Sequence, residues 1–325
     1  MASPNPPAAR DPDPRRWEAA APWFWVAAAV SAAWLMVSLA FAAEPAANRG
    51  ESLDALGWRS AMAAAAGLGG GVAVYGLCLN DLLDRRRDRA LRKAAAAGLI
   101  ASGRLPRRAG LGVCLAALLL AVFCADAMGP ASLKLTLLLA GGVLFYNLTL
   151  RFVPGMGVVG LGLLIALLMM VPNPRAGFLW PVLLSMTQVM AIGRWRNRGA
   201  YTPAWSNWLV VLGWAFWVLW VVVLIRERAG LAAGVVSWWL PAAAGGVGLV
   251  VAIWWGRSQR GRAAVGRFAV GWLLVIDATW LASWGRWDAA GLHLGLLVAT
   301  GFTAWAWSRR VPTGRVLSTN LRGVN

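Results

Sequence analysis

Apolar stretches long enough to cross a lipid bilayer recur along the whole chain, and no other sequence feature restricts the fold as strongly. A transmembrane helix needs about 20 mostly apolar residues. Of the 325 residues, 59% are hydrophobic and 14% charged, and the mean hydropathy is +0.61, which excludes an ordinary soluble domain. We therefore expect an all-α, polytopic membrane bundle of about nine to ten transmembrane helices. The stretches lie at residues 23–43, 61–80, 109–128, 132–150, 155–172, 177–193, 206–225, 233–256, 266–284 and 290–308.

The apolar stretches also define the domain organisation. Residues 1–22 are rich in proline and carry charges of both signs, which predicts a disordered tail rather than a cleavable signal. Residues 23–308 form one transmembrane domain, and residues 309–325 form a basic tail.

The positions of the basic residues indicate the orientation in the membrane. The net charge of +18 could suggest nucleic-acid binding, but the 31 basic residues concentrate in alternate loops, as the positive-inside rule predicts. We expect a multi-pass protein of a bacterial-type inner membrane, with both termini in the cytoplasm and no nucleic-acid partner. Only seven basic residues then fall on the outer side: Arg49, Arg59, Lys134, Arg175, Arg226, Arg228 and Arg286.

Cysteine, histidine and glycine patterns exclude several kinds of site. The three cysteines lie in apolar stretches without CxxC spacing, and His293 is the only histidine, so neither a zinc site nor a haem site is expected. His293 is predicted to be a packing or interfacial residue. The glycine-rich run at residues 67–71 lacks the lysine of a phosphate-binding loop, which favours close helix packing instead.

Acidic residues are few, and most of the thirteen fall in the N-terminal tail or on the outer side. Three of the remaining four, Asp81, Asp84 and Asp88, follow the second apolar stretch directly after Asn80. If the helix continues, these carboxylates share one face and repel one another, and a hard divalent cation such as Mg²⁺ would offset the repulsion. The alternative is a solvated helix face on which they pair with nearby arginines, namely Arg85, Arg87 and Arg92.

Three motifs together resemble the UbiA family of intramembrane prenyltransferases. The first is the NDxxDxxxD pattern at residues 80–88, which is similar to the first aspartate-rich motif of that family. The second is the run from Ser102 to Ala109 (SGRLPRRA), and the third is the run from Tyr146 to Arg151 (YNLTLR). They occur in the order and at the approximate spacing of the family.

The resemblance implies a horseshoe of helices around a central cavity, open to the cytoplasm and to the lipid. Such enzymes use Mg²⁺ to bind a prenyl diphosphate and transfer the prenyl group to a lipophilic, commonly aromatic, acceptor. Membrane lipid and these two substrates are then the expected partners. By the resemblance, Asp81, Asp84 and Asp88 would bind the metal with Asn80 as a neutral ligand, and Arg104, Arg151 and Tyr146 would contact the diphosphate.

One motif of the family is missing. The second aspartate-rich motif should fall near residues 188–200, but the sequence has no acid between Asp126 and Glu227. In one account, arginines take over the charge of the second metal, because guanidinium groups match phosphate oxygens. In the other, the chain has lost catalysis and binds a prenyl lipid or prenyl diphosphate. The residues concerned in the first account are Arg194, Arg196 and Arg198, with Gln188 and Asn197 as neutral ligands.

Asp277 lies inside the ninth predicted span, where an ionisable side chain is a candidate functional residue. The alternative is a structural hydrogen bond to Thr279, Ser283 or a neighbouring helix. Because Asp277 is the only acid well inside a predicted span, a transporter is a weaker hypothesis than an Mg²⁺-dependent prenyltransferase.

Overall fold

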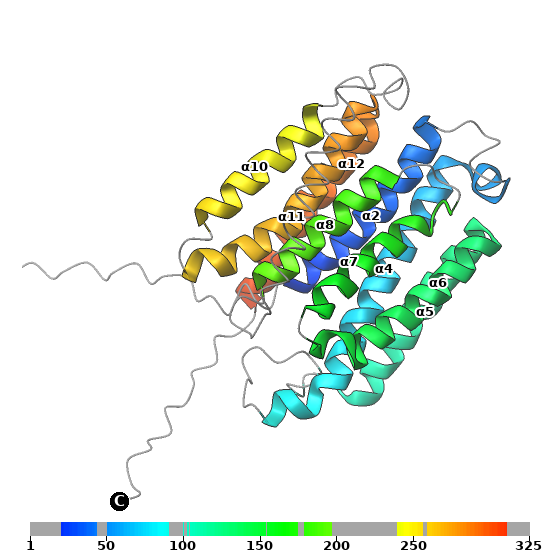
Figure 1. Ribbon diagram of the computed structural model, residues 1–325. Coiled ribbons are helices and arrows are strands. Elements are labelled where there is room, and N and C mark those ends of the chain that lie inside the picture. The colour runs from blue at the N-terminus through cyan, green and yellow to red at the C-terminus, as the bar shows by residue number, and fades with distance from the viewer. Residues whose placement is uncertain are drawn as a thin grey trace, which may run out of the picture.

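All the regular secondary structure in the described part of the chain is helical. The computed structural model describes residues 21–43, 51–90, 100, 103, 105–153, 155–174, 179–196, 239–255 and 259–310. These residues form nine α-helices and one 3₁₀ helix, η1 (Figure 1). The bounds are α2 Ala21–Ala43, α4 Glu51–Ala90, α5 Arg107–Met128, α6 Pro130–Leu148, η1 Leu150–Phe152, α7 Met156–Met170, α8 Leu179–Arg196, α10 Trp239–Trp255, α11 Gln259–Ser283 and α12 Trp287–Arg310.

Each predicted span except 206–225, which lies outside the described residues, corresponds to one of these helices. Helix α2 begins at Ala21, two residues before the predicted start of the domain, and α12 ends at Arg310, two residues after its predicted end. The largest difference concerns α4, which runs for 40 residues although its apolar stretch covers only the middle. Gly57, with φ of 71°, puts a kink near its N-terminal end, and its C-terminal end remains helical because leucine, arginine and alanine are good helix formers in water as well as in lipid.

Five of the described helices, α2, α4, α5, α6 and α12, are long and apolar enough to cross a membrane. Helices α7, α8 and α11 contain shorter apolar segments. The outer faces of α5 and α6 carry exposed leucines and phenylalanines, and Phe123 is 75% exposed. Such faces are stable against lipid but not against water. The chain therefore has the features of an integral multi-pass membrane protein.

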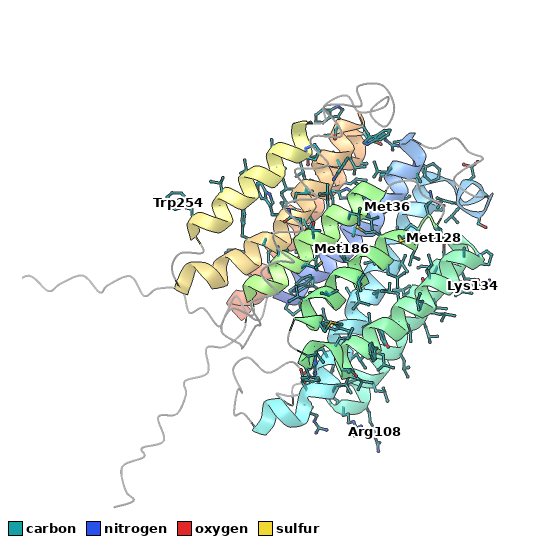
Figure 2. The ribbon with its side chains drawn as sticks, in the orientation of Figure 1. Met36, Arg108, Met128, Lys134, Met186 and Trp254 are labelled. Carbon is teal, nitrogen blue, oxygen red and sulfur yellow. The ribbon has the colours of Figure 1, made fainter. Side chains whose placement is uncertain are left out.

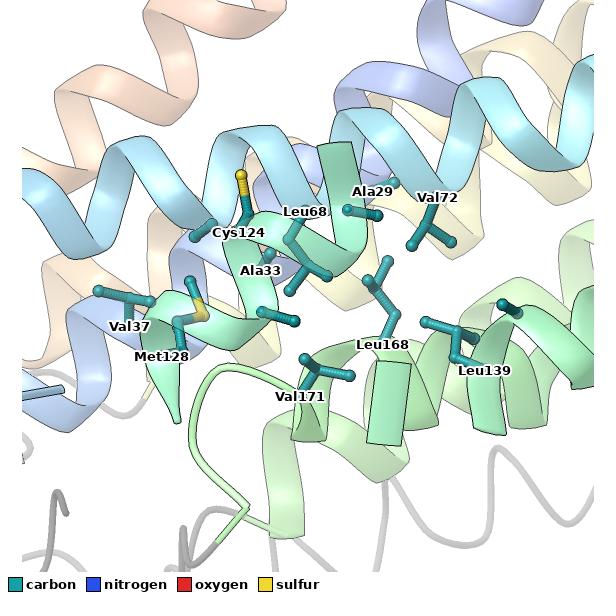
Figure 3. Packing of buried hydrophobic residues seen from close by; sticks show 14 of the residues in the cluster. Ala29, Ala33, Val37, Leu68, Val72, Cys124, Met128, Leu139, Leu168 and Val171 are labelled. Carbon is teal, nitrogen blue, oxygen red and sulfur yellow. The ribbon is translucent and has the colours of Figure 1, made fainter. Parts of the chain in front are cut away.

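Small residues bring α4 close to both of its neighbours, as the glycine-rich run predicted. A Cβ atom on Gly69 would lie 2.5 Å from the main-chain oxygen of Ala29 in α2. A Cβ atom on Gly71 would lie 2.7 Å from the main-chain oxygen of Ala117 in α5. Only glycine allows both approaches, so the prediction of close helix packing is confirmed. The core that forms here joins α2, α4, α5, α6 and α7 (Figure 3).

Helix α2 links the two halves of the bundle. It packs against α4 and α7 on one side and against α11 and α12 on the other. Figure 1 shows α4, α5 and α6 at one edge of the molecule and α10 at the other, with α2, α7 and α8 between them. A second buried cluster, which includes Leu35, Met169, Leu184, Leu281 and Ala289, fills the space between α2 and the C-terminal helices.

A tight turn reverses the chain between α5 and α6. Gly129, with φ of 119°, separates the two helices, and Pro130 begins the second. Glycine tolerates this backbone conformation and proline suits the first helical turn. As a result α6 runs back toward the end of α4 that carries the aspartates, and η1 follows it there.

Candidate active site

The aspartate-rich motif lies on a continuous helix, as the sequence analysis required. Helix α4 extends to Ala90, so Asn80, Asp81 and Asp84 all lie within its last turns. Asn80 is exposed, whereas Asp81 and Asp84 are half-buried. Asp88 belongs to the same helix, but its side chain lies outside the described residues. Two of the three predicted carboxylates can therefore be located.

Arg151, in η1, connects the aspartate-rich motif to the end of α6. Its Nη1 donates hydrogen bonds to Asn80 Oδ1 and, over 2.8 Å, to Asp84 Oδ2, while its Nη2 donates to Asp84 Oδ1. The Arg151 and Asp84 side chains are only 14% and 19% exposed. This two-pronged, partly buried arrangement is the stronger kind of arginine–carboxylate pair. Residues that are 67 or more positions apart in the sequence thus meet at one place.

The surroundings of Arg151 leave one of its donors without an acceptor. The guanidinium carbon lies 4.5 Å from the centre of the Phe152 ring, so the aromatic face supports the cation from one side. Among the described residues, Nε of Arg151 is buried without a hydrogen-bond partner, and so is Nε of Arg85 on α4. Buried donors of this kind normally have an acceptor, and an anion would supply one.

Asp81 connects the end of α4 to the segment that precedes α5. Its Oδ2 accepts a 2.7 Å hydrogen bond from the main-chain N–H of Ile100. The Ile100 side chain is buried against Gly110, at a place where a Cβ atom would lie 2.3 Å from Ile100 Cδ1. Gly103, with φ of 78°, donates through its main chain to the carbonyl of Ile100 and makes a turn. The neighbouring Arg104, a predicted diphosphate ligand, lies outside the described residues.

Tyr146 lies near the end of α6 that leads to Arg151. It is half-buried, and its ring reaches Gly160 of α7, where a Cβ atom would come within 3.2 Å of Tyr146 Cδ2. Gly160 therefore makes room for the ring between α6 and α7.

Helix α8 ends on the same side of the bundle as Arg151. A Cβ atom on Gly193 would lie 3.9 Å from Val158 at the start of α7, and one on the adjacent Gly157 would lie 3.0 Å from Cα of Arg151. Arg194 and Arg196 follow Gly193 within α8, but their side chains lie outside the described residues, as does the whole of Arg198.

The oxygen donors at the end of α4 suit a hard divalent cation by type. The described part of the chain contains no group of three or more histidine, cysteine, aspartate or glutamate side chains arranged to hold a metal ion. However, Asn80 and Asp84 already bind a cationic group, because the Arg151 guanidinium lies against their oxygens. The donor chemistry is therefore compatible with Mg²⁺, which prefers carboxylate and carbonyl oxygens.

Asp277 belongs to a different polar cluster. It is buried, and Oδ2 accepts a 2.6 Å hydrogen bond from Ser31 Oγ of α2. His293 is also buried; its Nε2 lies 3.1 Å from the main-chain oxygen of Ser31, and its Nδ1 lies 2.9 Å from that of Ala289. The structure thus shows the hydrogen bond to a neighbouring helix that was the alternative for Asp277, and His293 is a packing residue.

Sequence reasoning missed Ser31, Phe152 and the main-chain N–H of Ile100. A main-chain donor leaves no signature in the residue type, and Ser31 is 246 positions from Asp277. Phe152 could have been noticed, because it directly follows Arg151 and aromatic side chains commonly cover guanidinium groups.

Comparisons with known proteins give a structural likeness without a sequence match. No protein-family model matches the sequence, and no curated protein matches it significantly. The structure matches UbiA homologs across most of the chain. An apo UbiA homolog from Aeropyrum pernix K1 has a TM-score of 0.49 at 15% identity, covering 86% of this chain and 97% of that one. A digeranylgeranylglyceryl phosphate synthase has a TM-score of 0.47 at 13% identity, covering 91% and 96%. A UbiA homolog from Archaeoglobus fulgidus bound to GPP and Mg²⁺ has a TM-score of 0.45 at 14% identity, covering 90% and 99%.

Proposed function

We propose that the chain is a UbiA-type intramembrane prenyltransferase that transfers an isoprenyl group from a prenyl diphosphate to a lipophilic acceptor. One observation carries the proposal: Arg151 contacts Asn80 and Asp84, so two motifs identified separately in the sequence meet at one place. A solvated helix face, the alternative for the aspartates, would not require an arginine from another helix.

The charges at this place suit a diphosphate. The buried Nε atoms of Arg151 and Arg85 lack acceptors among the described residues, and phosphate oxygens would accept from them. The apolar outer faces of α5 and α6 suit contact with lipid, from which a prenyl chain would enter. The molecule thus combines a polar helix end with an apolar body, as an amphiphilic substrate requires.

In the proposed reaction the bond between the allylic carbon and the diphosphate oxygen breaks, and the electron pair leaves with the diphosphate. The acceptor then forms the new bond to the allylic carbon and releases a proton to water. Arg151 would stabilise the charge that develops on the leaving diphosphate. Exclusion of water would protect the allylic cation from hydrolysis.

Asn80, Asp81 and Asp84, with Asp88, are the residues that would hold Mg²⁺, which supplies positive charge to the leaving group when bound. Because the second aspartate-rich motif is absent, we assign its charge role to Arg194 and Arg196 of α8 and to Arg198, which lies outside the described residues. The lipid-soluble acceptor and the prenyl diphosphate are the proposed partners.

The test is diphosphate release by the purified protein in lipid, with and without Mg²⁺. Geranyl, farnesyl and geranylgeranyl diphosphate serve as donors, and a membrane lipid and quinone-precursor extract supplies the acceptor. Asp84→Asn should lower Mg²⁺-dependent release by about a hundredfold or more. It should keep the fold, because an amide oxygen still accepts from Arg151.

Asp126→Asn is the matched control, because Asp126 is an exposed aspartate near the C-terminal end of α5. Its release rate should equal that of the wild type. Full turnover by Asp84→Asn would refute the assignment of Asp84 to the site.

The missing second motif favours one alternative, a non-catalytic protein that binds a prenyl lipid or prenyl diphosphate. That function predicts tight binding of the donors with no diphosphate release in the presence of the acceptor extract. The same assay therefore separates the two functions.

A further inference from the structure

Asp84, a proposed metal ligand, is already paired with a side chain of the protein itself. Both of its carboxylate oxygens accept hydrogen bonds from Arg151. The same guanidinium also donates a hydrogen bond to Asn80 Oδ1, a neutral oxygen next to the Asp84 carboxylate. Two of the four expected ligands thus already share one cation.

A divalent cation cannot bind these oxygens without displacing the Arg151 guanidinium. The guanidinium lies along the carboxylate edge, and a second cation at hydrogen-bonding distance from the same oxygens would be strongly repelled in a partly buried setting. The pair is only 14% and 19% exposed, so water and salt screen this repulsion poorly.

On the basis of the proposed function, we infer that the Arg151–Asp84 ion pair keeps divalent cations out of this site until a diphosphate draws Arg151 away. The guanidinium can exchange partners, because its fork fits phosphate oxygens as well as carboxylate oxygens. Its unpartnered Nε provides a further donor that Asp84 does not use.

Exchange of this kind couples the two ligands. A diphosphate that engages Arg151 frees Asp84 for a cation, and a cation on Asp84 frees Arg151 for a diphosphate. Since such coupling is reciprocal, each ligand raises the affinity for the other by the same factor. The protein alone should therefore bind divalent cations weakly.

The experiment measures Mn²⁺ binding to the full chain in phosphatidylcholine nanodiscs without diphosphate, by the electron paramagnetic resonance signal of free Mn²⁺. Wild type should bind Mn²⁺ weakly. Arg151→Gln should bind it about tenfold or more tightly, because Asp84 is released. Adding Asp84→Asn to that variant should remove the gain.

Arg286→Gln is the matched control. Arg286 makes a comparable two-pronged pair with Asp288, with Nε–Oδ1 and Nη2–Oδ2 distances of 3.0 Å. This variant should bind Mn²⁺ like the wild type. If Arg151→Gln does not fold, Arg151→Lys keeps the charge without the fork and should show a smaller gain in affinity.

Tight Mn²⁺ binding by the wild type, or an unchanged affinity in both Arg151 variants, would overturn the inference. Because the titration contains no diphosphate and no acceptor, it can be read whether or not the protein transfers prenyl groups. Failure of the proposed function would appear instead as absent diphosphate release by the wild type.

Discussion

Ser31 is the central residue of the buried polar cluster between α2, α11 and α12. Its hydroxyl donates to Asp277, and its carbonyl oxygen lies against His293. All three side chains are buried in an apolar bundle, where an unpaired polar group is costly. The cluster therefore links three helices through one small residue.

Ser31→Ala should destabilise the fold. It leaves Asp277 Oδ2 without its hydroxyl donor, which we expect to lower the free energy of unfolding by about 1–3 kcal/mol. Thermal unfolding in detergent measures the effect. Thr303→Ala is the control, because that residue is exposed and its hydroxyl donates to the Ala299 carbonyl of its own helix.

Pairing Ser31→Ala with Asp277→Leu provides a second check. Replacing both partners by apolar groups removes the unpaired acceptor, so the double variant should recover part of the lost stability. A double variant less stable than Ser31→Ala alone would show that Asp277 contributes through other contacts.

At the scale of residues, the sequence predicts which side chains are candidates for the site but not which groups they contact. Asp81 and Asp84 stand out because they are acids at the end of an apolar helix. Their partners, the N–H of Ile100 and the guanidinium of Arg151, depend on how distant segments fold back. Three-dimensional packing supplies that information, and residue type does not.

At the scale of helices, glycine determines how closely α4 approaches its neighbours. Hydropathy predicted where the helices occur, and the small-residue run at 67–71 predicted which one packs tightly. It could not predict that Gly69 faces α2 whereas Gly71 faces α5, because that depends on the rotation of α4 about its axis. Hydropathy also underestimated the length of α4, since it marks only the apolar part of a helix.

Gly69→Ala should be poorly tolerated. The new Cβ atom would lie 2.5 Å from a main-chain oxygen of α2, so a backbone must move. We expect a loss of about 1–3 kcal/mol of unfolding free energy. Thermal unfolding of the purified variant in detergent tests this.

Gly112→Ala is the matched control on α5, because a Cβ atom there meets nothing within 4 Å. It should leave stability unchanged or raise it by about 0.5–1 kcal/mol through helix propensity. Equal losses at both positions would mean that helix contact does not explain the effect.

At the scale of the whole molecule, the basic residues are distributed unevenly among the loops of the sequence. Figure 2 shows Arg108, at the start of α5, and Lys134, in α6, at opposite ends of this helix pair. By the positive-inside rule we expect the end that carries Arg108, within the most basic loop, to face the cytoplasm. The candidate active site lies at that same end, because α4 ends there and α5 begins there.

A cysteine-labelling experiment tests this orientation. In a background with Cys78, Cys114 and Cys124 changed to alanine, a membrane-impermeant maleimide applied to intact cells should label Lys134→Cys but not Arg108→Cys. Permeabilised cells should label both. The reverse pattern in intact cells would place the candidate site outside the cytoplasm.

The ion pair between Asp84 and Arg151 also affects how the protein can be made. Chains are synthesised from the N-terminus, and these residues are 67 positions apart, so about 3–13 s of elongation separate them. During that interval α5 and α6 are synthesised, so both precede the arginine in time. Assembly of the candidate site must therefore follow synthesis of α5 and α6, and a chain that stops short of η1 carries the aspartates without their partner.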